Sequence, residues 1–453
     1  MAQNVLCAEC SKHNIAQMFL PFKRTIETTV STDKPIALIE RLAKDFFTCP
    51  ECPFCRLVEG TIKAAPITLE PGDVCSLQRF TYAYAYEDVR SEGRDPALWF
   101  PASAWGEEYI DSISNSQNCG QSGRSWVAAL TWGKSWIPDS EATEQRAVGV
   151  AELVGYIFPE GGGYKNSNIG SSETAERIKE KHTFRLRAMP TSNTLEGRLL
   201  RARHVDSDRV DTNLLRSWVS LCEEDHDTSA TSPSSLALDS DLTLHVIDVK
   251  NNCLITLPSG MQYATLSYVW GPPSTPQLCW TQETTARLLA IGGLDKWWND
   301  VPTTITDAMV VCKNLRIRYL WVDALCIQQD DEVMRARTIA QMDSVYTSSF
   351  LTIVCASGKD SWSGIPGVRQ TPRNIFKLVE DVQGVNLTNA CLDYEEAEET
   401  FVWKLRGWTL QEEFLSNRLL VFSEHQAFFR CRHAAYSEDT VMECPSSEGV
   451  RLA

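Results

Sequence analysis

Three short apolar runs, separated by two helical patterns, constrain the fold of this chain more than any other feature. The runs are YATLSYVWG (263–271), RYLWVDALCI (318–327) and SFLTIVCAS (349–357). Near-continuous apolar runs of this length are typical of strands covered on both faces, and parallel strands need helical connections between them. The pattern therefore predicts an α/β fold in which helices cover both faces of a parallel sheet.

Polar residues follow the apolar runs, at the strand ends where open α/β sheets bind their ligands. Gly271 permits a tight turn or a close backbone approach. Trp270 either stacks on a base or nicotinamide or packs in the core, and Gln328 either binds a ligand or is an ordinary loop residue. With Trp408, which is considered below, the candidate ligand-binding residues are Ser267, Trp270, Gly271, Asp323, Gln328 and Trp408.

Asp323 is a carboxylate inside an otherwise apolar stretch, YLWVDALCI (319–327). A carboxylate buried without partners is costly, so either the fold supplies donors for it or the site uses its charge. One interpretation is an acceptor that ties down backbone N–H groups of the following loop. The other is a residue that organises a ligand pocket, for instance by binding ribose hydroxyls. We favour the acceptor.

Composition narrows the classes of function. The 453 residues carry a net charge of −16, which argues against a protein whose main task is binding nucleic acid or an anionic membrane surface. No apolar stretch approaches the roughly 20 residues that span a bilayer, and the N-terminus lacks the features of a secretory signal. We therefore expect a cytoplasmic protein whose 16 cysteines are thiols or metal ligands rather than disulfides.

Four N-terminal cysteines form two C-x2-C pairs, Cys7 with Cys10 and Cys52 with Cys55. The spacing inside each pair suits tetrahedral zinc. The stretch between the pairs, residues 11–51, is longer than a compact zinc ribbon uses. Two interpretations stay open: a zinc site, or a set of reduced thiols in a small core.

Changes in composition divide the chain into regions. Residues 1–160 are rich in Cys and Trp, and we expect a mixed α/β region there. Residues 161–240 contain Gly-, Ser- and Thr-rich linkers around one helical segment. Residues 241–440 hold the alternating strand and helix pattern, and residues 441–453 form a tail without a packing pattern.

Four segments in order resemble the heterokaryon-incompatibility (HET) domain of filamentous fungi. Those similar to its three signature blocks are YATLSYVWG (263–271), RYLWVDALCIQQDD (318–331) and RGWTLQEEF (406–414). MDSVYTSSFLTIVCASG (342–358) is similar to the block between the second and the third. Each block alone is weak, but all of them in sequence are highly specific. CPECPFCRLV (49–58) also resembles a cysteine block near the N-terminus of full-length members.

The resemblance implies a role in self/non-self recognition or defence, a form of innate immunity that ends in growth arrest or programmed cell death. It implies a protein partner or self-assembly. It also implies a distant kinship with TIR domains, which have a flavodoxin-like α/β fold. Many TIR domains cleave NAD and others only assemble into signalling complexes, so NAD hydrolysis and a non-catalytic interaction module both stay open.

Glu412 is the catalytic candidate that this kinship indicates. In WTLQE (408–412) it lies one helical turn after Trp408, and NAD-cleaving TIR domains similarly have a Trp followed one turn later by the catalytic glutamate. Loss of nicotinamide develops an oxocarbenium-like sugar, which a fixed carboxylate can stabilise. The alternative is that Glu412 and Glu413 only supply negative charge to a helix N-terminus.

Overall fold

The chain folds into two compact units, each of them discontinuous in sequence. Unit 1 comprises Met1–His204, Phe376–Cys391 and Asp439–Val441, and unit 2 comprises Val205–Ile375, Leu392–Glu438 and Met442–Ala453. The domain boundaries near residues 160, 240 and 440 stay a prediction. The computed structural model describes residues 5–19, 37–65, 67–87, 125–130, 148–159, 182–189, 201–225, 243–407, 409–432 and 434–441.

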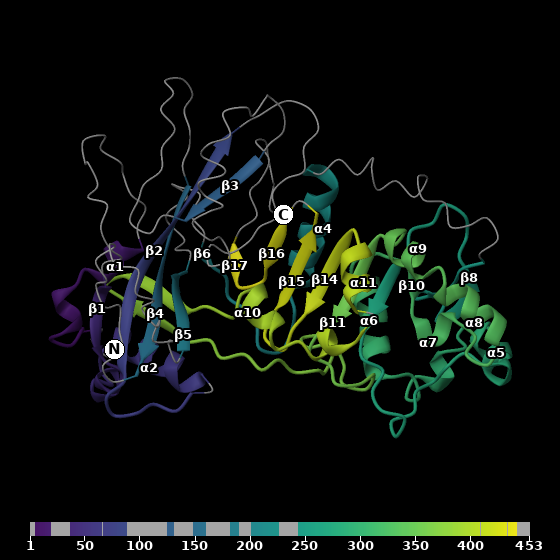
Figure 1. Ribbon diagram of the computed structural model, residues 1–453, viewed down its shortest axis with the longest axis horizontal. Coiled ribbons are helices and arrows are strands. Elements are labelled where there is room, and N and C mark those ends of the chain that lie inside the picture. The colour runs from purple at the N-terminus through teal and green to yellow at the C-terminus, as the bar shows by residue number, and fades with distance from the viewer. Residues whose placement is uncertain are drawn as a thin grey trace, which may run out of the picture. The chain divides into compact units, whose positions relative to one another are not determined.

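Unit 1 is built on a seven-stranded sheet (Figure 1). Its order is β1-β2-β4-β5-β13-β12, β3 pairs with β2, and every pairing is antiparallel. The mixed α/β character predicted for the N-terminal region is confirmed, and its sheet is antiparallel. The strands are β1 (Ala37–Leu42), β2 (Val74–Glu87), β3 (Ser125–Leu130), β4 (Val148–Phe158), β5 (His182–Ala188), β12 (Val379–Val382) and β13 (Val385–Asn389), and a separate pair joins β6 (Arg201–Ala202) to β17 (Thr440–Val441).

Helix α2 (Pro53–Ala64) supplies much of the core of unit 1. Pro53 occupies the first helical position, where its missing N–H is no loss. Phe54, Leu57 and Val58 are fully buried against the inner residues of the sheet. The other helices of this unit are η1 (Cys10–Lys12), α1 (Ile15–Met18) and η2 (Ala43–Thr48).

Unit 2 is built on an eight-stranded sheet with the order β16-β15-β14-β11-β9-β10-β7-β8. The four central strands β14, β11, β9 and β10 are parallel, and the strands on either side of them are antiparallel. The α/β prediction is confirmed, but the sheet is mixed rather than parallel throughout. The strands are β7 (His245–Asp248), β8 (Cys253–Thr256), β9 (Ala264–Ser267), β10 (Tyr319–Trp321), β11 (Leu351–Cys355), β14 (Arg418–Phe422), β15 (Ala427–Cys431) and β16 (Ala435–Ser437).

Short helices connect these strands. The described helices of unit 2 are α4 (Thr212–Asp225), α5 (Gln282–Leu288), η5 (Asp295–Trp297), α6 (Thr303–Asn314), α7 (Asp323–Cys326), α8 (Glu332–Ile339), α9 (Met342–Thr347), α10 (Tyr394–Glu398), η6 (Val402–Leu405) and α11 (Thr409–Leu415). Helix α4 contains Trp218 and Cys222, and both are buried. Trp218 stacks with Tyr436 of β16, which agrees with a packing role.

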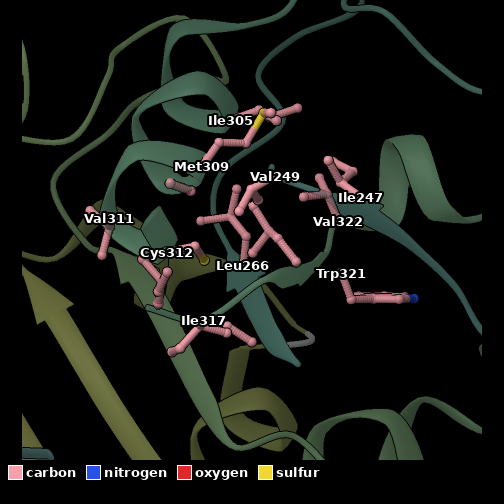
Figure 2. Packing of buried hydrophobic residues seen from close by; sticks show 14 of the residues in the cluster. Ile247, Val249, Leu266, Ile305, Met309, Val311, Cys312, Ile317, Trp321 and Val322 are labelled. Atoms are coloured by element: carbon pink, nitrogen blue, oxygen red, sulfur yellow. The ribbon is translucent and has the colours of Figure 1, made fainter. Parts of the chain in front are cut away.

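The core of unit 2 lies between α6 and the parallel strands (Figure 2). Ile305, Met309 and Cys312 recur at helical spacing and are completely buried. They pack in one cluster with Leu266 of β9 and Val322, which follows β10. This packing fixes the ends of the parallel strands, from which the candidate site is built.

The strand predicted over residues 318–327 is wrong in its second half. Strand β10 ends at Trp321, and Asp323 is the first residue of helix α7. The physical reason is local, because an aspartate at a helix start can accept a free backbone N–H, as Asp323 does from Ala324 at 2.7 Å. The run is apolar because both segments are buried, not because both are strand.

Candidate functional site

The candidate site of unit 2 lies at the carboxyl ends of β9, β10 and β11, where the strand pattern places it. Ser267 is the last residue of β9, and Asp323 follows β10. Helix α11 brings Glu412 to the same place from a distant part of the sequence. The structure therefore brings together three of the residues that the sequence singles out.

Glu412 is buried, with only 5% of its surface exposed. The hydroxyl of Ser267 donates a hydrogen bond to Oε2 of Glu412. The indole Nε1 of Trp403, in η6, donates in turn to Oγ of Ser267 at 2.6 Å. A chain of donors therefore runs from Trp403 through Ser267 to Glu412 and fixes the orientation of its carboxylate.

Asp323 accepts a hydrogen bond from the indole of a second tryptophan, Trp270. Nε1 of Trp270 donates to Oδ2 of Asp323 at 2.7 Å, and the backbone N–H of Ala324 donates to Oδ1 at 2.7 Å. The edge of the Trp270 ring thus faces the carboxylate. The bond from Ala324 is of the kind that the acceptor interpretation of Asp323 predicts, and a ligand-binding role for Asp323 stays a prediction.

The charge of Glu412 acts on the carboxyl group of Asp323. Burial and, to a smaller extent, the charge of Glu412 raise the pKa of Asp323 to about 6, although the N–H of Trp270 and the guanidinium of Arg406 oppose the rise. Burial also holds the pKa of the Tyr346 phenol well above its ordinary value, and both carboxylates add to that effect. Like charges brought together in a partly buried place are typical of sites that use them.

Access to Glu412 is closed in this structure. A crevice lined by Met342, Tyr346, Gln411, Glu412 and Leu415 reaches the carboxylate, but it has no room for a water molecule. Glu412 is therefore packed against its hydrogen-bond partners and does not open into a cleft beside Trp270 and Asp323. A ligand could reach its carboxylate only if this part of α11 shifted.

The remaining predicted residues take different places. Gly271 has φ +90°, and a Cβ built on it would lie 2.6 Å from Cβ of Asp360, so both backbone conformation and space require glycine. The side chain of Gln328 donates to Asp330 at 3.1 Å, as an ordinary loop residue would. Trp408 lies outside the described residues.

Sequence reasoning missed three contributors to this site. Trp403 lies nine positions before Glu412 and outside the RGWTLQEEF block, so nothing in the spacing points to it. Arg406, the first residue of that block, donates to the backbone carbonyl of Tyr268, just after β9. From the sequence, Tyr346 is expected on the buried apolar face of a helix. Only the fold shows that its hydroxyl lies near the carboxylates.

Unit 1 contains a separate cluster of four cysteines. The sulfur atoms of Cys7, Cys10, Cys52 and Cys55 all lie within 4.8 Å of one another. Cys10, Cys52 and Cys55 are buried, and Cys7 is partly buried. Cys49, the fifth cysteine of this region, is not in the group. The two predicted pairs are thus brought together although residues 11–51 separate them.

The spacing of these sulfur atoms fits a single tetrahedral metal ion. Four thiolates at a zinc–sulfur distance of about 2.3 Å stand about 3.8 Å apart along each tetrahedral edge. Sγ of Cys55 lies 3.8 Å from Sγ of Cys7 and 3.6 Å from Sγ of Cys10. The four cysteines could therefore hold a metal ion without a large rearrangement.

Comparison with known proteins identifies one family. Residues 263–412 match the family model described as heterokaryon incompatibility protein (HET), which covers about a third of the chain. The matched stretch begins just before β9 and ends at Glu412. No curated protein and no solved structure matches the chain. Among the residues that the structure describes, no helix is long and apolar enough to cross a membrane.

Proposed function

Because residues 263–412 form a HET domain, we propose that this chain acts in self/non-self recognition or defence of the heterokaryon-incompatibility type and that its activation ends in growth arrest or cell death. The observation that carries the proposal is the family match together with the buried polar network at its strand ends. Buried thiols such as those of Cys312 and Cys326 support placing the chain in a reducing compartment such as the cytoplasm.

We propose further that the HET domain is related to flavodoxin-like and TIR-like folds. Its parallel strands lie in the order β10-β9-β11-β14, which is 2-1-3-4 when they are numbered along the chain. That order is the beginning of the flavodoxin arrangement 2-1-3-4-5. The antiparallel strands β15 and β16 continue the sheet beyond β14 and distinguish this domain from an all-parallel one.

The enzymatic form of the proposal is hydrolysis of NAD. The support for it is the pair of carboxylates, since the charge of Glu412 helps to raise the pKa of Asp323 at strand ends where a purely structural network needs no second acid. In this form Glu412 stabilises the positive charge that develops on the ribose as nicotinamide leaves. Ser267 and Trp403 orient its carboxylate, and the segment carrying α11 must shift to admit the substrate.

A second candidate function is a non-catalytic module that works by assembly. Two large apolar side chains near Glu412 in sequence face solvent, Leu405 with 85% and Phe414 with 84% of their surfaces exposed. A contiguous exposed apolar patch is typical of a surface that meets a partner, and in this proposal the two side chains contribute to one. In this form Glu412 is a structural acceptor and the death signal depends on contact through α11.

One experiment separates the two forms. The purified chain is incubated with NAD while nicotinamide release and molar mass in solution are both measured. Nicotinamide release that saturates with NAD supports the enzyme. Concentration-dependent self-association without release, abolished by Phe414→Ser, supports the assembly module.

We also propose that the metal ion which the cysteine cluster of unit 1 could hold is zinc. A tetrahedral set of four thiolates is typical of structural zinc sites. The support is the separation of the sulfur atoms, all within 4.8 Å of one another.

A further inference from the structure

We infer that the metal ion at the four cysteines fastens the N-terminal segment, residues 5–19, onto helix α2, and that Arg41 is the counter-charge built into this site. The inference rests on the zinc site proposed above and extends it to a residue that is not a ligand. It concerns unit 1 alone and is independent of the chemistry of the HET domain.

The fastening follows from where the ligands lie. Cys7 and Cys10 belong to the N-terminal segment, whereas Cys52 is the N-cap of α2 and Cys55 lies in its first turn. The segment has little regular structure, because η1 has three residues and α1 has four. Helices this short are not stable on their own in water. A metal ion bound by both pairs would therefore join this segment to a stable helix.

Apart from Leu6, which packs against the core of unit 1, the other contacts of the segment lie beyond Cys10. The side chain of Gln383 accepts from the backbone N–H of Ala16 at 3.0 Å and donates to the carbonyl of His13 at 3.2 Å. Ile15 and Phe19 are buried in the core of unit 1. These contacts hold the far part of the segment, so loss of the metal should free residues near Cys7 and Cys10 before it unfolds the unit.

Arg41 is positioned as a partner of the sulfur atoms. Its Nη2 lies 3.0 Å from Sγ of Cys55, and its Nη1 lies 4.0 Å from Sγ of Cys10. The guanidinium of Arg41 lies over the ring of Phe46, 3.6 Å from the ring centre, and this cation–π contact helps to hold it in place. Arg41 is partly buried, and within the described residues no carboxylate forms an ion pair with it.

Charge balance explains why such a residue is needed. Four thiolates and one divalent zinc ion leave a net charge of −2 in the core of unit 1. A buried charge of this size is unfavourable unless a cation or hydrogen-bond donors compensate it. Arg41 supplies one positive charge and two N–H groups directed at the sulfur atoms of Cys55 and Cys10. Outer partners of this kind tune metal affinity by about 10- to 100-fold in other sites.

The test uses the full chain, purified without an affinity metal, with zinc content measured by elemental analysis. Wild type should contain about one zinc per chain, Cys52→Ser should lose it, and Cys49→Ser should keep it as the matched control. Zinc release to a chromogenic chelator then tests Arg41. Arg41→Met should start with the same zinc content and release it about 10-fold faster, while Arg41→Lys should lie between this variant and wild type.

Fastening is read out by hydrogen exchange of residues 5–19, with and without chelator. Chelation should raise exchange near Cys7 and Cys10 while α2 remains protected. If Arg41→Met does not fold, Arg41→Gln, which keeps an N–H donor without the charge, replaces it in the same comparison. Zinc release from the charge-free variant at the wild-type rate overturns the role of Arg41 and leaves the zinc site standing. Wild type without zinc overturns the zinc site itself and the inference with it.

Discussion

The hydroxyl of Ser267 donates a hydrogen bond to the carboxylate of Glu412 across 145 positions of sequence. Ser267 ends a parallel strand, and Glu412 lies in the first turn of a helix. Both residues are buried, so this contact links the beginning and the end of the stretch that matches the HET family model. The predictions for unit 2 start from this contact.

Removing the hydroxyl of Ser267 should destabilise unit 2. Ser267→Ala removes the hydrogen-bond partner of Nε1 of Trp403 and of Oε2 of Glu412. A buried polar group left without a hydrogen bond lowers the free energy of unfolding by about 1–3 kcal/mol. The measurement is the free energy of unfolding in denaturant. Ser274→Ala, at an exposed position, is the control and should change nothing. An unchanged midpoint for Ser267→Ala would mean that the network contributes no stability.

Asp323 should make stability depend on pH in an unusual direction. Its pKa is raised to about 6 in the folded protein, against about 3.9 for an unfolded aspartate. The folded state therefore favours the protonated acid, so its contribution is fully present below about pH 4 and is lost as the pH rises to about 6. Denaturant unfolding across this range should show the wild type losing stability relative to Asp323→Asn as the pH rises. A constant difference between the two proteins would mean that Asp323 is solvated.

Asp439 should have the opposite dependence in unit 1. Burial raises its pKa, but Arg187 at 3.3 Å and Lys377 at 3.6 Å outweigh burial and lower it to about 2. Its contribution is present above about pH 4 and is lost as the pH falls towards 2. At pH 7, Asp439→Asn should lower stability by about 3 kcal/mol, because it removes the charge that faces Lys377 and leaves Arg187 with Glu152 as its remaining carboxylate. Glu40→Gln, at an exposed position of β1, is the control; equal melting temperatures for both variants would refute the prediction.

Gly271 should tolerate no side chain. Its φ of +90° disfavours any other residue, and a Cβ would also meet Asp360 at 2.6 Å. Gly260 has φ +75° with open space around it, so Gly260→Ala measures the backbone effect alone. We expect about 1 kcal/mol of destabilisation for Gly260→Ala and about 1–3 kcal/mol more for Gly271→Ala. Equal losses of stability in the two variants would show that the backbone near Asp360 moves aside without cost.

The alternating pattern of apolar runs and helices was enough to predict the parallel strands β9, β10 and β11 and the edge where Ser267 and Asp323 lie. These features are local, because each strand and helix is coded by its own residues. The antiparallel pairing of β15 with β14 and the place of residues 376–391 in the sheet of unit 1 depend on contacts between distant segments, which no local pattern contains. The predicted length of β10 was wrong because a buried helix and a buried strand are equally apolar.

The candidate site was predictable to a similar degree. Ser267 and Asp323 stood out as polar residues in or after apolar runs, and Glu412 stood out through the resemblance of WTLQE to NAD-cleaving TIR domains. Trp403 did not, since a tryptophan is usually a core residue and its contact with Ser267 spans 136 positions. The four clustered cysteines followed from C-x2-C spacing, whereas the place of Arg41 beside them is visible only once β1 and α2 are placed.

Glu413, the neighbour of Glu412, is a poor control for catalysis. Its carboxylate lies 3.1 Å from Arg430 and 3.4 Å from Lys404, so its removal disturbs an ion-pair network. Glu399 is exposed and lies in the same unit, and Glu399→Gln serves better.

The most direct test is the rate of nicotinamide release from NAD by wild type, Glu412→Gln and Glu399→Gln. Glutamine keeps the acceptor for Ser267 but removes the charge, so folding should be retained. The account predicts release by wild type and Glu399→Gln, and release by Glu412→Gln that is lower by about 100- to 1000-fold, the usual effect of removing one stabilising group. Wild type that arrests growth without consuming NAD, or Glu412→Gln that cleaves NAD at the wild-type rate, would contradict it.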